Sequence, residues 1–360
     1  MCNNAARILC EAIQFGDVVR VPGPAHNMEI EHQMATQTTV FAAPDLAAVR
    51  DAHRRIAPRI HRTPVLTSSS LNEIAGAEIF FKCENLQKTG SFKIRGATNA
   101  VFSMSEEEAK HGVVAPSSGN HAAALSLAAR WRGIPAWLIM PSNSSAVKKR
   151  AVEAYGGKIT ECEPNMASRE ATSAEVMKRT GARLVHPYND PRVIAGQGTA
   201  ALELLDQVPN LDLVITPVSG GGLLGGTAIT VKSLRPEIRV IGGEPANADD
   251  AARSLASGKI EPVSKAHTMA DGLRATLVPL TFGILREHVD DISLVTEDEI
   301  VSTMLLLWER MKIVVEPSGA VAAAPVLGRK VRAEGKRVGI ILSGGNLDLQ
   351  QLPWTERAKS

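Results

Sequence analysis

The stretch Leu211-Asp-Leu-Val-Ile-Thr-Pro-Val-Ser-Gly220-Gly-Gly-Leu-Leu-Gly225 decides the fold of this chain. Its first half, Leu211–Pro217, is rich in apolar and β-branched residues and predicts a buried strand. The serine and glycines that follow predict a tight turn, and Leu223–Ser233 has the pattern of a helix. A strand, a glycine-rich turn and a helix in this order are typical of the βα unit of a parallel sheet.

The same alternation of short apolar runs and helical patterns recurs from Pro44 onward, which predicts an α/β fold with parallel sheets covered by helices. The predicted strands are Glu78–Glu84, Gly112–Ala115, Ala136–Met140, Lys158–Cys162, Arg183–His186, Leu211–Pro217, Ile238–Glu244, Asp291–Val295 and Arg337–Leu342. The predicted helices are Phe92–Phe102, His121–Trp131, Ala146–Tyr155, Ser168–Arg179, Val193–Asp206, Leu223–Ser233, Asp249–Ala256, Glu297–Met311 and Pro317–Leu327.

Length and composition narrow the function classes. The chain has 360 residues, and because a domain usually takes ~100–200 residues we expect two lobes. Forty Lys and Arg against 38 Asp and Glu leave a formal charge of +2, so no field that would attract nucleic acid is expected. No apolar run approaches the ~18 residues that a membrane span needs.

The cysteines and the N-terminal segment suggest where the protein works. Four cysteines without a C-x-x-C pair argue against a zinc ribbon and a disulfide framework, which favours a reducing cytoplasm. Residues 1–40 lack clear periodicity and a signal peptide's apolar centre, so we predict a disordered extension there.

Ligands of open parallel sheets bind beyond the carboxyl ends of the strands, where helices begin. Four such loops are rich in Gly, Ser, Thr or Asn: Lys88–Ser91, Ser117–His121, Ser219–Gly222 and Ser343–Asn346. We therefore expect the binding site where these loops meet.

The loop Ser219–Gly225 supports two interpretations. Its spacing Gly220-x-Gly222-x-x-Gly225 satisfies the dinucleotide fingerprint, and Glu244 ends the next strand at about the distance of a ribose-binding acid, so a nicotinamide dehydrogenase is one hypothesis. Both interpretations share a phosphate site, because glycine amides and a helix N-terminus attract an anion. A tight turn without a ligand is the alternative.

Lys93 stands in the first turn of a predicted helix whose expected N-cap is Ser91. The positive end of the helix and burial beside Phe92 would both lower the pKa of its ammonium group. An amine of this kind is what a Schiff-base enzyme requires. By itself the position is also compatible with an ordinary surface lysine.

These motifs together resemble a known family. The segments Ser91–Gly96, Ser117–His121, Ser219–Leu223 and Ser343–Asn346, in this order, are similar to the fold-type-II pyridoxal-phosphate enzymes, in particular the serine/threonine dehydratase and serine racemase branch. The resemblance runs from about Pro44 to Leu349. It accounts for Lys93 and for loops that the nicotinamide hypothesis leaves without a role.

The resemblance implies a tryptophan-synthase-β-like fold and assigns cofactor contacts. Lys93 would carry the pyridoxal phosphate covalently, Phe92 would pack beside it, and Asn120 would bond the ring hydroxyl. The phosphate would lie in the loop made by Ser219, Gly220, Gly221, Gly222 and Leu223. Ser343 would face the pyridine nitrogen, and because a hydroxyl cannot keep that nitrogen protonated, β-elimination is favoured over transamination.

The loop Ser117–His121 would bind the substrate. It offers donors at a helix N-terminus, suited to a carboxylate, and the resemblance gives Ser117, Ser118, Gly119 and His121 this role. Ser118 lies where the racemases of the family place a second acid/base, and a plain carboxylate contact is the alternative.

A metal site is expected at Glu244, Asp250 and the carbonyl of Ala248. Carboxylate and carbonyl oxygens suit Mg²⁺ or Ca²⁺, although acids here also suit a helix N-terminus. The resemblance to the divalent-cation site of the racemase branch favours Mg²⁺, with Ca²⁺ or Mn²⁺ as alternatives.

The sequence thus predicts a large cofactor-binding domain, residues 41–111 and 190–360, and a small mobile domain, residues 112–189, with the cofactor in the cleft. The expected activity is that of an L-serine/L-threonine dehydratase, an ammonia-lyase that gives a 2-oxo acid and ammonia. Serine racemase and hydroxyaspartate dehydratase are the alternatives. The expected partner is a small hydroxy-amino acid, and the resemblance suggests a homodimer.

Overall fold

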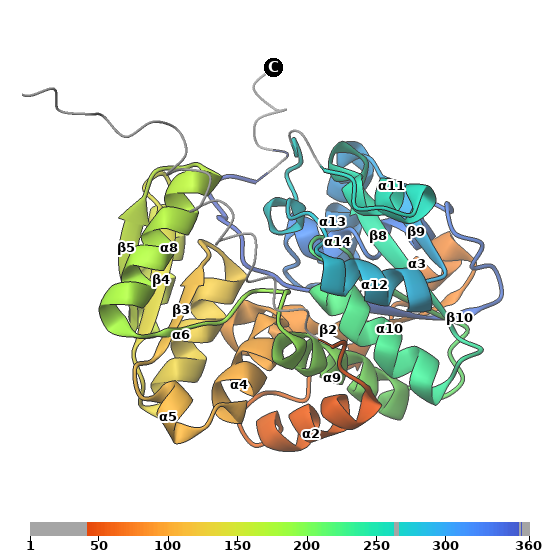
Figure 1. Cartoon of the computed structure of the whole chain (residues 1–360). Helices are drawn as coiled ribbons and strands as arrows, with labels where there is room; N and C mark the ends of the chain where they lie inside the picture. The colour runs from red at the N-terminus through yellow and green to blue at the C-terminus, as the bar shows by residue number, and fades with distance from the viewer. Residues whose placement is uncertain (1–41, 263–265, 353, 355–360) are drawn as a thin grey trace, which may run out of the picture. The chain divides into compact units, whose positions relative to one another are not determined.

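The computed structural model describes residues 42–262, 266–352 and 354, and residues 41–360 form one compact unit (Figure 1). The predicted extension 1–40 lies outside the described residues. Element labels follow Figure 1.

The larger sheet has the strand order β1-β2-β10-β7-β8-β9. Only β1 runs antiparallel, pairing with β2, and the other neighbours in this described sheet are parallel. Its strands are β1 (Val65–Leu66), β2 (Glu78–Cys83), β7 (Leu213–Pro217), β8 (Arg239–Pro245), β9 (Asp291–Val295) and β10 (Arg337–Leu342).

The smaller sheet is parallel throughout, in the order β5-β4-β3-β6. Its strands are β3 (Val113–Pro116), β4 (Ala136–Pro141), β5 (Gly157–Cys162) and β6 (Arg183–Leu184). The predicted α/β fold with parallel-rich sheets is confirmed. The division into two domains and the mobility of the smaller one stay predictions.

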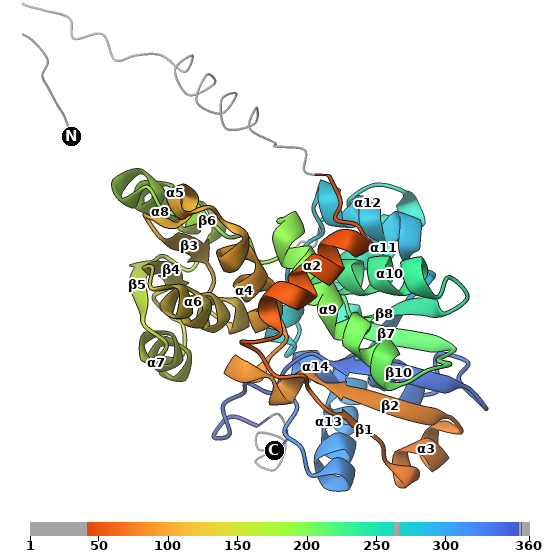
Figure 2. The same cartoon turned by 90° about the horizontal axis from the view of Figure 1, so that it is seen from below.

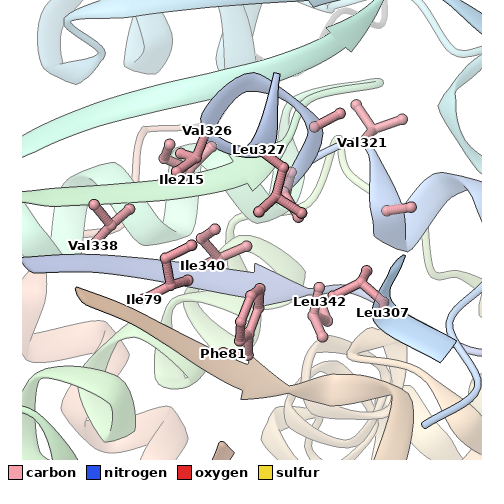
Figure 3. Close-up of a cluster of buried hydrophobic side chains, with 14 of the residues drawn as sticks. Ile79, Phe81, Ile215, Leu307, Val321, Val326, Leu327, Val338, Ile340 and Leu342 are labelled. Carbon is pink, nitrogen blue, oxygen red and sulfur yellow. The ribbon is translucent and has the colours of Figure 1, made fainter. Parts of the chain in front are cut away.

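Helices cover both faces of the larger sheet. Ile340 points to one face, where it packs with Phe81, Ile215 and residues of the C-terminal helices (Figure 3), whereas the next residue, Ile341, packs on the other face. This alternation follows from the two-residue period of a strand. The helices are α2 (Leu46–Ile56), α3 (Ser69–Ala75), α4 (Lys93–Ser103), α5 (Glu106–Ala109), α6 (Asn120–Arg132), α7 (Ala146–Ala154), α8 (Met166–Thr180), α9 (Pro191–Gln207), α10 (Gly222–Leu234), α11 (Asp250–Ser257), α12 (Pro279–His288), α13 (Glu297–Met311), α14 (Pro317–Ala320) and α15 (Ala324–Leu327).

The sequence pattern missed some elements and merged others. It did not predict β1, α2, α3, α5 or α12, and it predicted one helix over Pro317–Leu327 where the structure has α14 and α15. Pro325 explains the break, because proline has no N–H for the carbonyl one turn earlier. None of the described helices has the length and apolarity to cross a bilayer.

Helix α4 lies between the two sheets, against α9 on one side and α6 on the other (Figure 2). Glycines allow the first contact: a Cβ on Gly196 would lie 2.6 Å from the Cα of Gly96. The amide of Gly96 also donates to the Gln197 side chain at 3.1 Å. Backbone therefore touches backbone three residues after Lys93.

A fully buried ionic network lies at the start of α4. The Arg95 guanidinium donates through Nε and Nη2 to Glu84, at 2.7 and 2.8 Å, and through Nη1 and Nη2 to Glu203, at 2.9 and 2.8 Å. A further Nη1 bond reaches Thr199, and Lys82 donates to Glu203 at 2.6 Å. Two cations thus face two carboxylates, and β2, α4 and α9 are tied together.

Replacing Arg95 by Lys tests this network. A single ammonium cannot form two bidentate pairs, so carboxylate oxygens of Glu84 and Glu203 stay buried without a donor. We expect the free energy of unfolding in urea to fall by about 3–5 kcal/mol. The control Arg54→Lys changes an exposed pair with Asp51 and should cost less than ~0.5 kcal/mol. Equal small losses would contradict the assignment.

Candidate active site

The carboxyl ends of both sheets face a cavity of about 550 Å³. Its walls come from the loops after β3, β6, β7 and β10 and from the starts of α4, α7 and α8. Gly221 lies behind this lining, against Thr281 and Leu277. The structure thus brings together loops that are far apart in the sequence. The predicted site residues that line the cavity are Phe92, Lys93, Ser117, Ser118, Gly119, Asn120, His121, Ser219, Gly220, Gly222, Leu223 and Ser343.

Lys93 is the first residue of α4, and its amine faces the cavity. Nζ lies 3.4 Å from the carbonyl of Pro187 and 4.9 Å from the Phe92 ring centroid. Burial lowers the pKa of Lys93 to about 8, although the carboxyl group of Glu316 opposes the shift. The amine is therefore available as a base or nucleophile near neutral pH.

The predicted N-cap of this helix is wrong. Phe92 occupies the cap position, while Ser91 is extended and pairs with Gly344. The hydroxyl of Ser91 is buried, and no partner for it is found within the described residues. Pairing with the end of β10 prevails over local capping, and it also brings Ser343 next to Phe92, whose amide donates to the Ser343 carbonyl at 3.0 Å.

Two neutral imidazoles lie near Lys93. Burial and then the charge of Lys93 lower the pKa of His121 to about 3 and that of His186 to about 4. His121 Nε2 donates to the Val185 carbonyl at 2.9 Å, and His186 Nδ1 accepts from the amides of Tyr188 and Asn189. They therefore add no second positive charge beside the amine.

The glycine loop forms an anion site at the start of α10. Ser219 and Gly221 have positive φ of 55° and 83°, and a Cβ on Gly220 would lie 2.6 Å from the Tyr188 ring. The hydroxyl of Ser219 donates to the Gly272 carbonyl at 3.0 Å. No backbone acceptor for the amides of Gly220, Gly222 and Leu223 is found in the described part of the chain. These free amides at a helix N-terminus fit a phosphate.

Sequence reasoning missed three cations of the cavity wall: Lys148, Arg169 and Arg274. Lys148 pairs with Asp271, and Arg274 donates to the Thr268 carbonyl. Arg169 is half-buried, and its Nε has no partner among the described residues. Lys148 and Arg169 lie in the first turns of α7 and α8, so the rule that ligands bind at carboxyl strand ends could have found them. Tyr188 and Glu316 were missed as well, and Glu316 follows no strand in the described structure.

The predicted metal residues lie away from the cavity lining. Both oxygens of Glu244 accept amides at the start of α11, from Ala251 at 3.0 Å and Ala252 at 2.9 Å. Asp250 Oδ2 is buried, with no partner in the described structure. Burial raises the pKa of Glu244 to about 8 and that of Asp250 to about 6. One unpaired carboxylate oxygen fits a hard cation, and the metal ion itself stays a prediction.

Comparison with known proteins identifies the family. The model of the pyridoxal-phosphate dependent enzymes matches residues 56–344. The chain belongs to this family. It is 52% identical to a β-hydroxyaspartate dehydratase of Paracoccus denitrificans over 303 residues, 84% of this chain and 96% of that protein.

Solved structures place this pyridoxal-phosphate enzyme in the predicted branch, that of the serine/threonine dehydratases and serine racemases. Maize serine racemase is similar with a TM-score of 0.85 and 47% identity, over 88% of this chain and 98% of that one. A bacterial-strain threonine deaminase, from T.th., gives a TM-score of 0.81 and 43% identity, over 85% and 99%. The resemblance is thereby confirmed, and the nicotinamide hypothesis finds no support.

The acid–base behaviour of Lys93 is testable in cofactor-depleted protein. With a pKa of about 8, the amine is protonated and inert below that pH and becomes nucleophilic above it. We expect its labelling by an amine-reactive reagent, mapped by peptide mass spectrometry, to reach half its maximal rate near pH 8. The phase should be absent in Lys93→Ala. A midpoint near the ordinary value of 10.5 would refute the assignment.

Proposed function

We propose that this pyridoxal-phosphate enzyme is a β-hydroxyaspartate dehydratase, which converts the amino acid to a 2-oxo dicarboxylic acid and ammonia. The observation that carries the proposal is Arg169, a cation of the cavity wall whose Nε has no partner among the described residues. The similarity to a β-hydroxyaspartate dehydratase supports it. The comparisons favour this alternative and the racemase over an L-serine/L-threonine dehydratase.

Arg169 suits the second carboxylate of such a substrate. A guanidinium donates bidentately to a carboxylate, and each charge-assisted bond contributes about 1.5–3 kcal/mol. The neighbouring cation Lys148 is already neutralised by Asp271. Arg169 therefore supplies the unbalanced positive charge that a dicarboxylic substrate requires, whereas serine would leave it unpaired.

The site residues fit pyridoxal phosphate. Free amides of Ser219–Leu223 would hold its phosphate, Ser343 would face its ring nitrogen, and Phe92 would pack beside the ring. When bound, the cofactor supplies an aldehyde for the amine group and a ring that withdraws electrons from Cα. Asn120 would donate to the ring oxygen, as its hydrogen-bond partners require.

Each step then has a residue. The loop Ser117–His121, at the N-terminus of α6, would hold the α-carboxylate. The neutral amine of Lys93 would take the α-proton. The β-hydroxyl then leaves as water, and hydrolysis of the unsaturated amine releases ammonia. The bound cation, the homodimer, the cytoplasmic location and closure of the smaller domain remain predictions attached to this proposal.

Serine racemisation is a second candidate, favoured by Ser118. Its side chain lines the same cavity as Lys93 and would provide a second group that transfers a proton. Two groups of this kind are needed to remove the α-proton and return it on the other face of Cα.

The first test exchanges the cation. Arg169→Met should lower kcat/KM for β-hydroxyaspartate about 100-fold, since it removes a charge-assisted pair of about 3 kcal/mol, and should change elimination from L-serine less than ~3-fold. Release of the 2-oxo acid measures both. The matched control is Arg179→Met, near the end of the same helix and 56% exposed. Equal losses on both substrates would exclude a role in recognising the second carboxylate.

The second test concerns Ser118. If it transfers a proton, Ser118→Ala should lower interconversion of L- and D-serine at least ~100-fold and 2-oxo acid release much less. Chiral chromatography and oxo-acid assays give both rates from one sample. A proportional fall of both rates would make Ser118 a binding residue only.

A further inference from the structure

The amide of Asn120 has a fixed orientation in the cavity wall. Its Oδ1 accepts a hydrogen bond from Asn346 Nδ2 at 2.9 Å, and its Nδ2 donates to Glu316 Oε1 at 2.9 Å. A primary amide has one acceptor end and two N–H groups. One N–H of Asn120 therefore remains, without a protein partner in the described structure, on a residue that lines the cavity.

The amide of Asn346 cannot exchange its two ends. Its Nδ2 donates both to Asn120 and to the Thr89 carbonyl, the latter at 2.7 Å. Both N–H groups are used, so rotation would bring an oxygen against two other oxygens. The side chain also packs against Gly90, where a Cβ would collide with it.

Glu316 provides two acceptors for two donors. Besides the Asn120 side chain, it accepts the backbone amide of Asn346 at 2.9 Å, and it is 4% exposed. Gly344 closes the pocket around it, because a Cβ there would lie 2.5 Å from Oε1. The carboxyl group therefore has one position, and Asn120 can meet it only with an N–H.

We infer that Glu316 and Asn346 are positioning residues that present an N–H of Asn120, rather than its carbonyl, to the ring oxygen of the cofactor. The inference rests on the proposed function, since it takes the cavity as the pyridoxal-phosphate site. A donor stabilises the ionised ring oxygen, whereas the reversed amide would repel it. Neither residue needs to touch the substrate.

The test uses cofactor-depleted full-length protein and pyridoxamine 5′-phosphate, which has the same ring oxygen but forms no covalent bond with Lys93. Glu316→Gln keeps the shape but offers one acceptor to two donors, so Asn120 is no longer held. We expect its Kd to rise about tenfold, the cost of one hydrogen bond. In the background of Asn120→Ala the same change should alter Kd less than ~2-fold. In the reconstituted protein, the absorbance band of lysine-bound cofactor should shift in Glu316→Gln.

Glu299→Gln is the matched control, because Glu299 also accepts a backbone amide and a side chain but lies at the start of α13, away from the cavity. It should change neither Kd nor the band. Equal effects of Glu316→Gln with and without Asn120 would overturn the inference, and so would an unchanged Kd.

A second variant covers the case in which Glu316→Gln does not fold. Asn346→Asp removes the donors that hold the Asn120 carbonyl, at an exposed position, and should also raise Kd about tenfold. An unchanged Kd there would refute the inference. If Asn120→Ala itself leaves Kd unchanged, the cofactor site is wrongly assigned and the proposed function fails. If only Asn120→Ala weakens binding, the inference alone fails.

Discussion

The position of Lys93 depends on the buried pairing of Arg95 with Glu84 and Glu203. Two carboxylates out of water are costly, and only a group with several donors in one plane can satisfy both. Arg95 does so while it joins β2, α4 and α9, and Lys82 balances the remaining charge. Because Lys93 precedes Arg95 by two residues on the same helix, the network fixes the point from which the reactive amine projects. Ionic pairing beneath the site thus provides rigidity that loops alone would not.

Charge is distributed unevenly around the amine. The two nearest imidazoles are neutral, and the Glu316 carboxyl, whose pKa burial raises to about 8, accepts hydrogen bonds from neutral amides. The cation Arg169 comes from a helix of the smaller sheet, whereas the anion site at Ser219–Leu223 comes from the larger one. The cofactor phosphate and the substrate's distal carboxylate would therefore be bound by different parts of the fold, which is consistent with relatives that differ in substrate but share the family.

Local sequence patterns predicted most of the framework. Strands β9 and β10 and helix α13 begin and end where predicted, because a continuous apolar run or a capping box, Thr296 with Glu299, marks them. The glycine- and serine-rich loops also pointed to the cavity. Arg169, Tyr188 and the partners of Asn120 could not be read in this way, since their roles arise from contacts between distant segments. Ser91 shows the same effect, because its pairing with Gly344 prevails over the local preference for a cap.

The close approach of Gly96 and Gly196 has a consequence for how substitutions at a distance affect the site. Where two helices meet through side chains, rotamer changes absorb part of any displacement; here main chain rests directly on main chain. A substitution that shifts α9 by a fraction of an ångström would therefore shift the segment carrying the reactive amine by a similar amount. The outer residues of α9, although remote from the chemistry, become places where turnover can be tuned without altering any group that binds substrate.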